Sequence, residues 1–378
     1  MLRIGIVAGE SSGDLLAADL ITSLKARLPN VHFEGIGGPH MQAAGCKILF
    51  SYKKLAIIGL LEVVSRYFEL FGIRRKILKH FLNSRPDVFI GVDAPDFNLR
   101  LEYLLHRQGV KTVHYVSPSI WAWRSYRIKK IKNSIDLMLV LFPFEKDIYL
   151  KNNIPVRYLG HPLADKIEFH QDKYSSRKYL GISSEKKVVA LMPGSRESEL
   201  KKIFPLQLRA ASICNQKRKD LIFITSVLSE ETAVIVEEKF KDYPNIEHRI
   251  FINKTKEVLL SADVGLLTSG TVTLEAMLCG LPMAVAYKIN WLSARIIRFM
   301  VKVSFAALPN LLAEKQVVKE FLQSDCKPNK MAEEVIRLLT KDESTFMKKI
   351  FNDIHHELRK GASTIAADEI ITLLYKKT

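Results

Sequence analysis

Two turns in the second half of the 378-residue sequence have the residue types that hold a diphosphate. The first, residues 192–197 (MPGSRE), follows an apolar run and begins a helical pattern. Gly194 and Ser195 are small enough for the backbone to approach a ligand, and Arg196 presents a planar fork of N–H groups that fits phosphate oxygens. The start of the helix adds free backbone N–H groups and the positive end of its dipole. The alternative is an ordinary turn with a surface arginine.

The second turn, residues 267–276 (LTSGTVTLEA), also joins an apolar run to a helical pattern. Ser269, Gly270 and Thr271 can hold a diphosphate at the start of the helix. Glu275 lies one helical turn further along, where its carboxylate can accept hydrogen bonds from two ribose hydroxyls. The alternative is a Ser/Thr helix cap followed by a solvated glutamate. Because both turns occur in one half of the chain, we predict a sugar-nucleotide site there.

A third turn, residues 9–14 (GESSGD), joins the first apolar run to a helix and matches the Gly-x-Ser-x-Gly pattern of the hydrolase nucleophile elbow. An elbow after the first strand of a chain would lack the preceding strands that supply part of the oxyanion hole. We therefore favour a tight turn at which a substrate approaches the backbone of Gly9, Glu10, Ser11 and Ser12.

A fourth turn, residues 91–98 (GVDAPDFN), directly follows a short apolar run. Asp93 comes at the carboxyl end of the expected strand, where a carboxylate can serve as a general base. A turn-forming aspartate is the alternative reading of Asp93. Asp96 is typical of the cap of the helix that follows.

An aromatic and basic loop, residues 114–124 (HYVSPSIWAWR), ends the next expected strand. Its His114, Trp123 and Arg124 can contact a sugar or a phosphate. His114 is the second candidate for the base, after Asp93. These residues and the turn at 9–14 together make the predicted acceptor side of the site.

Metal chemistry has no support in the sequence. No Asp-x-Asp pair follows a strand to hold a divalent ion against a diphosphate, so Arg196 and the helix N-termini would carry the charge of the leaving group. The four cysteines lie far apart and form no Cys-x-x-Cys pair, which argues against a zinc site or a disulfide framework and favours a reducing compartment. No cofactor is predicted, because the sugar nucleotide is a substrate.

The elements that position these turns follow an alternating βα pattern, which predicts two parallel sheets, each covered by helices on both faces. The pattern restarts after a polar segment at about 170–186. We predict an N-terminal Rossmann-like domain at 1–170, a C-terminal one at 171–345, and C-terminal helices at 346–378 that pack back on an N-terminal domain. A cleft between the carboxyl ends of the two doubly wound sheets is the expected active site. The predicted strands are residues 2–8, 31–36, 88–92, 112–116, 137–142, 156–159, 188–193, 221–227, 248–252, 264–268 and 282–287.

The net charge of +17 indicates a polyanionic partner, either nucleic acid, an anionic membrane surface or a phosphorylated substrate. No zinc finger, basic zipper or aromatic RNA-binding signature supports nucleic acid. The N-terminus has no signal peptide, and no stretch is long and apolar enough to span a bilayer.

Two amphipathic helical patterns favour a membrane surface instead. Residues 55–82 combine a wide apolar arc with flanking cations, and residues 291–302 set arginines along one side of an apolar helix, as interfacial helices do. A handful of such cations, each contributing about 1 kcal/mol near an anionic surface, suffices for peripheral binding. A buried core helix is the alternative for the first pattern. The membrane candidates are Leu61, Val63, Val64, Tyr67, Phe68, Leu70, Phe71, Arg74, Arg75, Trp291, Arg295 and Arg298.

Eight blocks of the sequence, taken in order, closely resemble the lipid-A-disaccharide synthase family, glycosyltransferase family 19, over essentially the whole chain. They are residues 7–14, 91–98, 114–124, 143–146, 160–162, 193–196, 269–277 and 308–312. The resemblance implies a GT-B fold and metal-independent transfer of 2,3-diacylglucosamine from UDP-2,3-diacylglucosamine to 2,3-diacylglucosamine 1-phosphate (lipid X). The products would be UDP and a β-1′,6-linked disaccharide phosphate of lipid A and lipopolysaccharide biosynthesis.

The same resemblance implies roles for particular residues. Asp93 would take the proton of the acceptor 6-hydroxyl in an inverting displacement. Arg196 and the turn at 269–271 would hold the diphosphate of UDP, with Glu275 near the ribose and Asn310 close by. The family further implies a homodimer, bound peripherally on the cytoplasmic face of the inner membrane. The alternative is another UDP-sugar enzyme of the GT-B fold, either an epimerase or a lipid-linked GlcNAc transferase.

Overall fold

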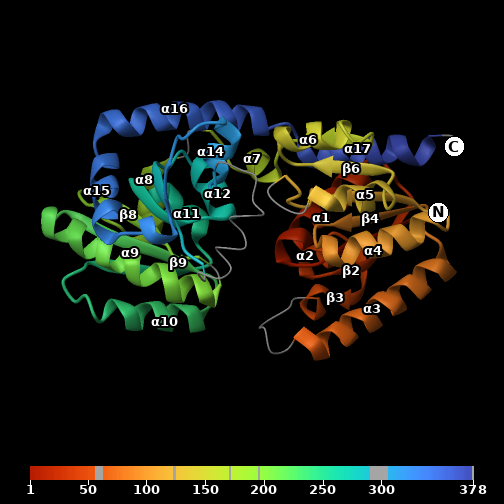
Figure 1. Ribbon diagram of the computed structural model, residues 1–378, viewed down its shortest axis with the longest axis horizontal. Coiled ribbons are helices and arrows are strands. Elements are labelled where there is room, and N and C mark those ends of the chain that lie inside the picture. Colours follow the sequence, from red (N-terminus) through yellow and green to blue (C-terminus); the bar gives the residue numbers. More distant parts are fainter. Residues whose placement is uncertain (56–62, 122–124, 170–171, 195, 290–304, 377–378) are drawn as a thin grey trace. The chain divides into compact units, whose positions relative to one another are not determined.

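The structure, a computed structural model, describes residues 1–55, 63–121, 125–169, 172–194, 196–289 and 305–376 (Figure 1). The chain divides into two compact units. Unit 1 consists of Met1–Asp165 and Leu358–Thr378, and unit 2 consists of Lys166–Glu357. Each unit is built on its own parallel sheet.

Unit 1 contains a seven-stranded parallel sheet with the strand order β3-β2-β1-β4-β5-β6-β7. Its strands are β1 (Leu2–Ala8), β2 (Val31–Gly37), β3 (Cys46–Ser51), β4 (Val88–Val92), β5 (Lys111–Tyr115), β6 (Leu137–Val140) and β7 (Val156–Tyr158). Its helices are α1 (Ser11–Lys25), α2 (Pro39–Ala43), α3 (Val63–Ser84), α4 (Pro95–His106), α5 (Ile128–Lys132), α6 (Pro143–Leu150), α7 (Pro162–Lys166) and α17 (Ala362–Tyr375), with short 3-10 turns η1 (Tyr52–Lys54) and η2 (Ser125–Arg127).

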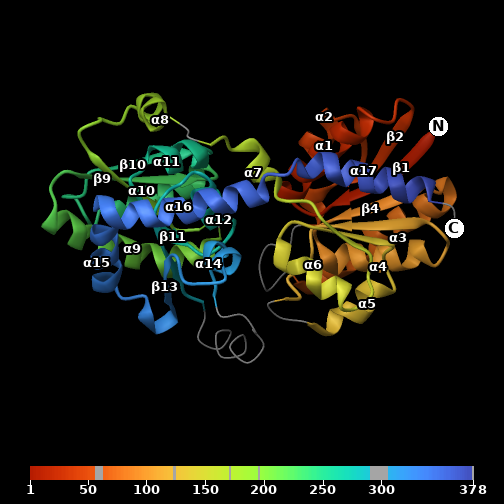
Figure 2. The ribbon, with the colours of Figure 1, turned by 90° about the horizontal axis from the view of Figure 1, so that it is seen from above.

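The two faces of this sheet bury separate apolar clusters. Ile4 and Ile6 of β1 pack with α1 and with the C-terminal helix α17 on one face, whereas Val7 and Phe89 pack with α3 and α4 on the other. Because successive strand residues point to opposite faces, a run of consecutive apolar residues is what a sheet covered on both sides requires. Figure 2 shows α17 lying over this sheet, and Lys111 Nζ donates to the carbonyl oxygens of Leu373 and Leu374, both at 2.9 Å.

Unit 2 contains a six-stranded parallel sheet with the order β10-β9-β8-β11-β12-β13. Its strands are β8 (Lys187–Met192), β9 (Leu221–Val227), β10 (His248–Ile252), β11 (Val264–Thr268), β12 (Met283–Tyr287) and β13 (Lys319–Leu322). Its helices are α8 (Lys173–Leu180), α9 (Glu197–Lys217), α10 (Glu230–Phe240), α11 (Thr255–Ser261), α12 (Thr271–Leu278), α14 (Leu308–Ala313), α15 (Pro328–Leu338) and α16 (Lys341–Leu358), with a 3-10 turn η3 (Gln323–Asp325).

The prediction of two doubly wound sheets with C-terminal helices is confirmed, and each predicted strand has a counterpart within a residue or two. Two strands, β3 and β13, were not predicted. Both lie at sheet edges and pair with one neighbour, so their residues are less completely buried and less uniformly apolar than those of central strands. Their sequences, CKILFS and KEFL, therefore lack the continuous apolar run that marked the others.

The helix predicted at 55–82 is observed as α3, Val63–Ser84. Ile73, Ile77 and Phe81 repeat every four residues and are buried in the apolar cluster of unit 1, so this half of the helix is amphipathic and contributes to the core. Phe71 points outward with 57% exposure, beside exposed Arg75. Leu70 and Arg74 are half-buried.

Most of the other membrane candidates cannot be placed on the structure. Leu61, Trp291, Arg295 and Arg298 lie outside the described residues, and so do the side chains of Val63, Val64, Tyr67 and Phe68. Among the helices that are described, none combines the length and the apolar content needed to cross a bilayer.

Candidate functional site

The four predicted turns flank the two points at which the strand order reverses. In unit 1 the chain builds outward from β1 in one direction and from β4 in the other, so the reversal lies between β1 and β4. In unit 2 it lies between β8 and β11. Sheets of this kind bind ligands at this point, outside the carboxyl ends of the strands. The turns after β1, β4, β8 and β11 are the four that the sequence singled out.

In unit 1 the two turns touch one another. A Cβ added at Gly9 would collide with the Cβ of Ala94, so glycine is required for this close approach. Glu10 is the N-cap residue of α1, and Ser12 Oγ donates a hydrogen bond to its carboxylate. Ser11, the residue that a nucleophile elbow would use, has an exposed side chain and no histidine partner among the described residues. The turn after β1 thus places Glu10 next to the turn that carries Asp93.

Asp93 has a left-handed backbone conformation, with φ of 52°, and Ala94 follows with φ of 42°. Two consecutive residues of this kind cost on the order of 1–2 kcal/mol each, and such strain is kept where the surroundings hold it in place. Here Asp93 N donates to Tyr115 O at 2.8 Å, and Asn98 Nδ2 donates to Asp93 O at 2.8 Å and to Val7 O at 3.2 Å. The position of the predicted base is therefore fixed from two neighbouring strands and from α4.

The prediction that Asp96 caps α4 is wrong. Ala94 is the N-cap residue, and Asp96 lies within the first turn of the helix, with its carboxylate directed to Arg127. The left-handed turn moves the helix start two residues earlier than the sequence pattern indicated.

The surroundings of Asp93 raise the pKa of its carboxyl group. Burial is the largest cause, and the negative charge of Glu10 adds to it. His114 and the backbone N–H of Ala94 act in the opposite direction without cancelling the effect. A carboxylate with a raised pKa is a stronger proton acceptor, which is the property that a general base needs.

His114 lies behind this turn rather than in an open site. Its Nδ1 is 2.6 Å from Oε1 of Glu102, and both side chains are completely buried. A Cβ at Gly91 would collide with the carboxylate of Glu102, so a glycine at this position of β4 makes room for this pair. Burial raises the pKa of Glu102, although His114 opposes that shift. The geometry gives His114 no exposed surface through which to contact a substrate directly.

A cavity of about 360 Å³ opens beside Asp93, which is large enough for a sugar ring. Its lining combines carboxylates, hydroxyls and aromatic rings. It is lined by Asp93, Pro95, Asp96, Val116, Ser117, Pro118, Ser119, Ile120, Trp121, Arg127, Leu141, Phe142 and Glu145. Trp123 and Arg124, which were predicted to lie here, are outside the described residues.

Glu145 is a buried carboxyl group in the wall of this cavity. It accepts hydrogen bonds from the backbone N–H groups of Leu141 and Phe142, at 3.2 and 3.1 Å, and so caps α6. Burial raises its pKa to about 8 despite these bonds and those from Ser117 and Trp121. Near neutral pH the group is therefore mostly protonated, and Asp93 is the less buried of the two carboxyl groups in the cavity wall.

In unit 2 the first turn presents Arg196. Gly194 has φ of 101°, and a Cβ there would meet the carboxylate of Glu199, so glycine is needed for both the conformation and the space. Arg196 is the N-cap residue of α9 and pairs with Glu199 through Nη1–Oε1 at 3.1 Å. Its side chain is 77% exposed, so the guanidinium can reach a ligand at the strand end. Ser195 lies outside the described residues.

The second turn of unit 2 presents the start of α12. β8 and β11 are adjacent and parallel, with Leu267 opposite Met192, so both turns lie at the carboxyl ends of neighbouring strands. Gly270 is the N-cap residue and Thr271 begins the helix, and both are exposed. Ser269 Oγ is occupied, because it donates to Ala306 O at 2.8 Å. The free backbone N–H groups of the first turn of α12 therefore offer the anion-binding surface.

Glu275 lies one turn along α12 and is half-buried. Burial raises the pKa of its carboxyl group, and it makes no ion pair among the described residues. A carboxylate without a cationic partner retains its acceptor capacity for the hydroxyls of a sugar.

Asn310 is engaged within the protein. Its side chain is completely buried, and Nδ2 donates to Val318 O at 2.9 Å and to Glu320 Oε1 at 2.7 Å. Its Oδ1 accepts from the N–H groups of Val317 and Val318 at 2.7 and 2.8 Å. Its amide thus anchors the segment next to Ser269, and a direct hydrogen bond to UDP would require one of these bonds to break.

Three residues of the site were not assigned a role from the sequence. On α4, Asn98 donates a hydrogen bond to Asp93 O, and Glu102 pairs with His114 beneath the Asp93 turn. Glu320 accepts hydrogen bonds from the N–H groups of Ala306 and Ala307, both at 2.9 Å. Gly91 was the one available signal for Glu102, because a glycine inside a strand marks a close approach. In the part of the chain that the structure describes, no group of three or more His, Cys, Asp or Glu side chains could hold a metal ion.

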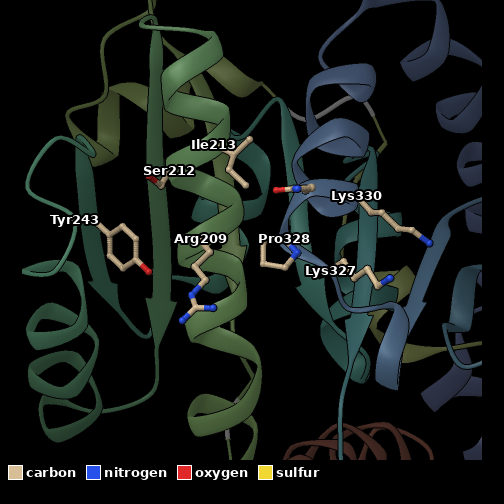
Figure 3. Close-up of a pocket in the computed structure, with 8 residues that line it drawn as sticks. Arg209, Ser212, Ile213, Tyr243, Lys327, Pro328 and Lys330 are labelled. Carbon is tan, nitrogen blue, oxygen red and sulfur yellow. The ribbon is translucent and has the colours of Figure 1, made fainter.

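A further hollow of about 450 Å³ lies in unit 2 between α9 and α15 (Figure 3). Arg209, Ser212 and Ile213 line it from α9, and Tyr243 and Lys330 line it from other elements. None of the predicted site residues contributes to it. Each unit therefore has its candidate site at its own strand-order reversal.

Comparison with known proteins identifies the family. A family model described as lipid-A-disaccharide synthetase matches residues 4–371. The lipid-A-disaccharide synthase of Vibrio parahaemolyticus serotype O3:K6 is 42% identical over 376 residues, which cover 99% of this chain and 99% of that relative. The match thus includes both strand-order reversals and the C-terminal helices.

Solved structures of similar fold are much more distant in sequence. The glycotransferase of kitacinnamycin is 18% identical, with a TM-score of 0.66 and coverage of 98% of both chains. A UDP-GlcNAc 2-epimerase from Neisseria meningitidis bound to UDP-GlcNAc is 13% identical, with a TM-score of 0.63, and covers 99% of this chain and 100% of that one. The GT-B fold is therefore confirmed, and it is shared by transferases and epimerases. The family match decides between them: the chain belongs to the lipid-A-disaccharide synthase family of glycosyltransferases.

Proposed function

We propose that the chain uses unit 2 to bind the UDP part of UDP-2,3-diacylglucosamine and unit 1 to bind and activate 2,3-diacylglucosamine 1-phosphate. The observation that carries this proposal is the different chemistry at the two strand-order reversals. One places a partly buried carboxylate with a raised pKa beside a cavity of about 360 Å³. The other places an exposed arginine and an open helix N-terminus at the carboxyl ends of two adjacent strands.

In the proposed step, Asp93 accepts the proton of the acceptor 6-hydroxyl as its oxygen attacks C1 of the donor sugar. The new bond joins this oxygen to C1, and the bond between C1 and the diphosphate oxygen breaks, so that UDP leaves with the bonding electron pair. Because attack and departure occur on opposite faces of the sugar, an α-linked donor gives a β-linked product. The proton ends on the carboxyl group of Asp93, and the raised pKa of that group favours the transfer.

The leaving group would be stabilised by unit 2. Arg196 and the N–H groups at the starts of α9 and α12 would bind the diphosphate oxygens, where negative charge develops. Glu275 would accept hydrogen bonds from the ribose hydroxyls. Asn310 would act indirectly, by holding the segment that contacts Ser269.

We further propose that the enzyme works peripherally at the cytoplasmic face of an anionic membrane. The outward face of α3 supports this proposal, because it carries exposed Phe71 beside the exposed cations Arg75, Lys76 and Lys79. The net charge of +17 adds long-range attraction to such a surface. The family resemblance is the support for a homodimer, which sedimentation at several protein concentrations would test.

The function is tested by UDP release with the two purified substrates. We expect UDP to form only when the diacyl UDP-sugar and lipid X are both present, together with the disaccharide phosphate. UDP release from the donor alone would indicate hydrolysis, and a change in the configuration of the donor sugar without an acceptor would indicate epimerisation. Either result would contradict the proposed transfer.

A further inference from the structure

The wall of the Asp93 cavity contains a cation that no predicted role uses. Arg127 of η2 lines the cavity, and its side chain is only 14% exposed. Its Nη2 donates to Oδ1 of Asp96 at 2.5 Å, and the carboxylate of Asp96 is itself 78% exposed. The guanidinium is therefore held at the cavity by a carboxylate that is mostly in water.

Three more cations, from three helices, lie near Arg127. They are Arg74 of α3, Arg100 of α4 and Lys130 of α5. Arg74 Nη2 donates to the carbonyl oxygen of Asp96 at 3.1 Å, and its guanidinium lies 4.8 Å from the centre of the Phe97 ring. Within the described part of the chain, neither Arg100 nor Lys130 forms an ion pair.

We define Arg74, Arg100, Arg127 and Lys130 as the basic cluster, in which Arg74 and Arg127 are partly buried and Arg100 and Lys130 are exposed. The pKa of Lys130 is lowered, first by burial and then by the charge of Arg127. The charge of Asp96 opposes this shift, and Arg100 and Arg74 add to it. Like charges held together are unfavourable unless an anion joins them. An anion bound at Arg127 would reduce this repulsion.

We propose that Arg127, supported by the basic cluster, binds the phosphomonoester of the acceptor substrate. This inference rests on the proposed function, since it takes the cavity beside Asp93 as the acceptor site. The acceptor carries its 1-phosphate on C1 and its reacting 6-hydroxyl on the CH2OH group of C5, the two carbons that flank the ring oxygen, and Asp93 and Arg127 both line one cavity. A guanidinium presents paired N–H groups that fit two phosphate oxygens, and the phosphate takes over the hydrogen bond that Asp96 accepts in the free protein.

The test compares kcat/KM for two acceptors, 2,3-diacylglucosamine 1-phosphate and the same sugar without its phosphate, in detergent micelles. In the unmodified protein the phosphorylated acceptor is preferred. In Arg127→Ala this preference falls by about 10-fold or more, as expected for the loss of a charge-assisted pair. Arg127→Lys retains the charge without the fork and loses less of the preference. Arg107→Ala, which removes an exposed arginine at the other end of α4, leaves the preference unchanged.

Several outcomes would overturn the inference. An equal fall for both acceptors in Arg127→Ala would mean that Arg127 acts on Asp93 or on the fold. An unchanged preference, combined with loss of binding to phosphatidylglycerol vesicles, would mean that the cluster serves a lipid headgroup. If circular dichroism shows that Arg127→Ala is unfolded, the ratio of kcat/KM for the two acceptors is measured in Arg127→Lys and Lys130→Ala instead. Asp93→Asn, measured in parallel, separates the two proposals. An active Asp93→Asn protein would contradict the role of Asp93 as the base, and it would leave the role of Arg127 to be decided by the preference for the phosphorylated acceptor.

Discussion

The two strand-order reversals have the same topology and opposite chemical characters. In unit 1 the turns after β1 and β4 are packed together, with Gly9 against Ala94 and a buried Glu102–His114 pair behind Asp93. In unit 2 the turns after β8 and β11 stay open, with exposed Arg196 and Thr271. Partial burial makes a carboxylate a better base, whereas open N–H groups and an exposed guanidinium suit the binding of a diphosphate. Sheet topology thus determined the place of each candidate site, and packing determined which of its side chains are buried and which are exposed.

The largest expected effect comes from removing the carboxylate of unit 1. Asp93→Asn keeps the shape of the side chain but cannot accept the proton, so kcat should fall by about 10²- to 10⁴-fold. Because unit 2 is untouched, the Kd for UDP measured by calorimetry should change by less than about threefold. Loss of UDP binding in this variant would contradict the separation of roles between the two units.

The corresponding change in unit 2 should have the reverse signature. Arg196→Ala removes a charge-assisted pair to the diphosphate and should weaken UDP binding by about 10- to 100-fold. The affinity should also lose part of its dependence on ionic strength. Lys201→Ala, on the exposed side of the same helix, is the matched control. Unchanged UDP affinity in Arg196→Ala would exclude the arginine from the donor site.

The close packing of unit 1 predicts a loss of stability. Gly91→Ala places a methyl group against the buried carboxylate of Glu102, and we expect the free energy of unfolding to fall by about 1–3 kcal/mol in urea titrations. Gly72→Ala in α3 is the control, because a Cβ there meets nothing within 4 Å and alanine favours a helix by roughly 0.5–1 kcal/mol. Equal effects of the two substitutions would argue against the packing account of the Asp93 turn.

The smallest effect concerns pH. Asp93 must be deprotonated to act as a base, and the negative charge of Glu10 raises its pKa. Glu10→Gln removes that charge, so the pKa of Asp93 should fall and the acid limb of the kcat/KM profile should move to lower pH. Glu185→Gln, an exposed change in unit 2, should leave the limb in place. A shift of the limb to higher pH would mean that another group limits the rate in acid.

Much of the fold was predictable because its strongest signals are local. Central strands such as β4 and β11 are buried on both faces and read as continuous apolar runs, and each is followed by small and polar residues at the start of a helix. β3 and β13 were missed for the converse reason, since edge strands need less apolar sequence. The turns that carry Asp93 and Arg196 were found by their position after these central strands.

The roles of individual side chains were less predictable. His114 was predicted to contact a sugar or a phosphate because it belongs to an aromatic and basic loop. In the structure its ring is buried against Glu102, twelve residues earlier in the chain. The family resemblance implied that Asn310 lies close to UDP, but its amide is bonded to Val317, Val318 and Glu320. Arg127 belongs to no motif, and the role proposed for it follows from its place in the cavity wall and from cations of three helices. Each case depends on a neighbour that no local pattern identifies.

The sequence by itself determined the two parallel sheets, the turns at their carboxyl ends and the family, because periodicity and local motifs are properties of short segments. Only the tertiary structure decided which of the candidate groups are buried, paired or exposed. The physical reason is that the pKa of Asp93, the enclosure of His114 and the charge around Arg127 depend on desolvation and on charges from distant segments. Those quantities exist only after the chain has brought the segments together.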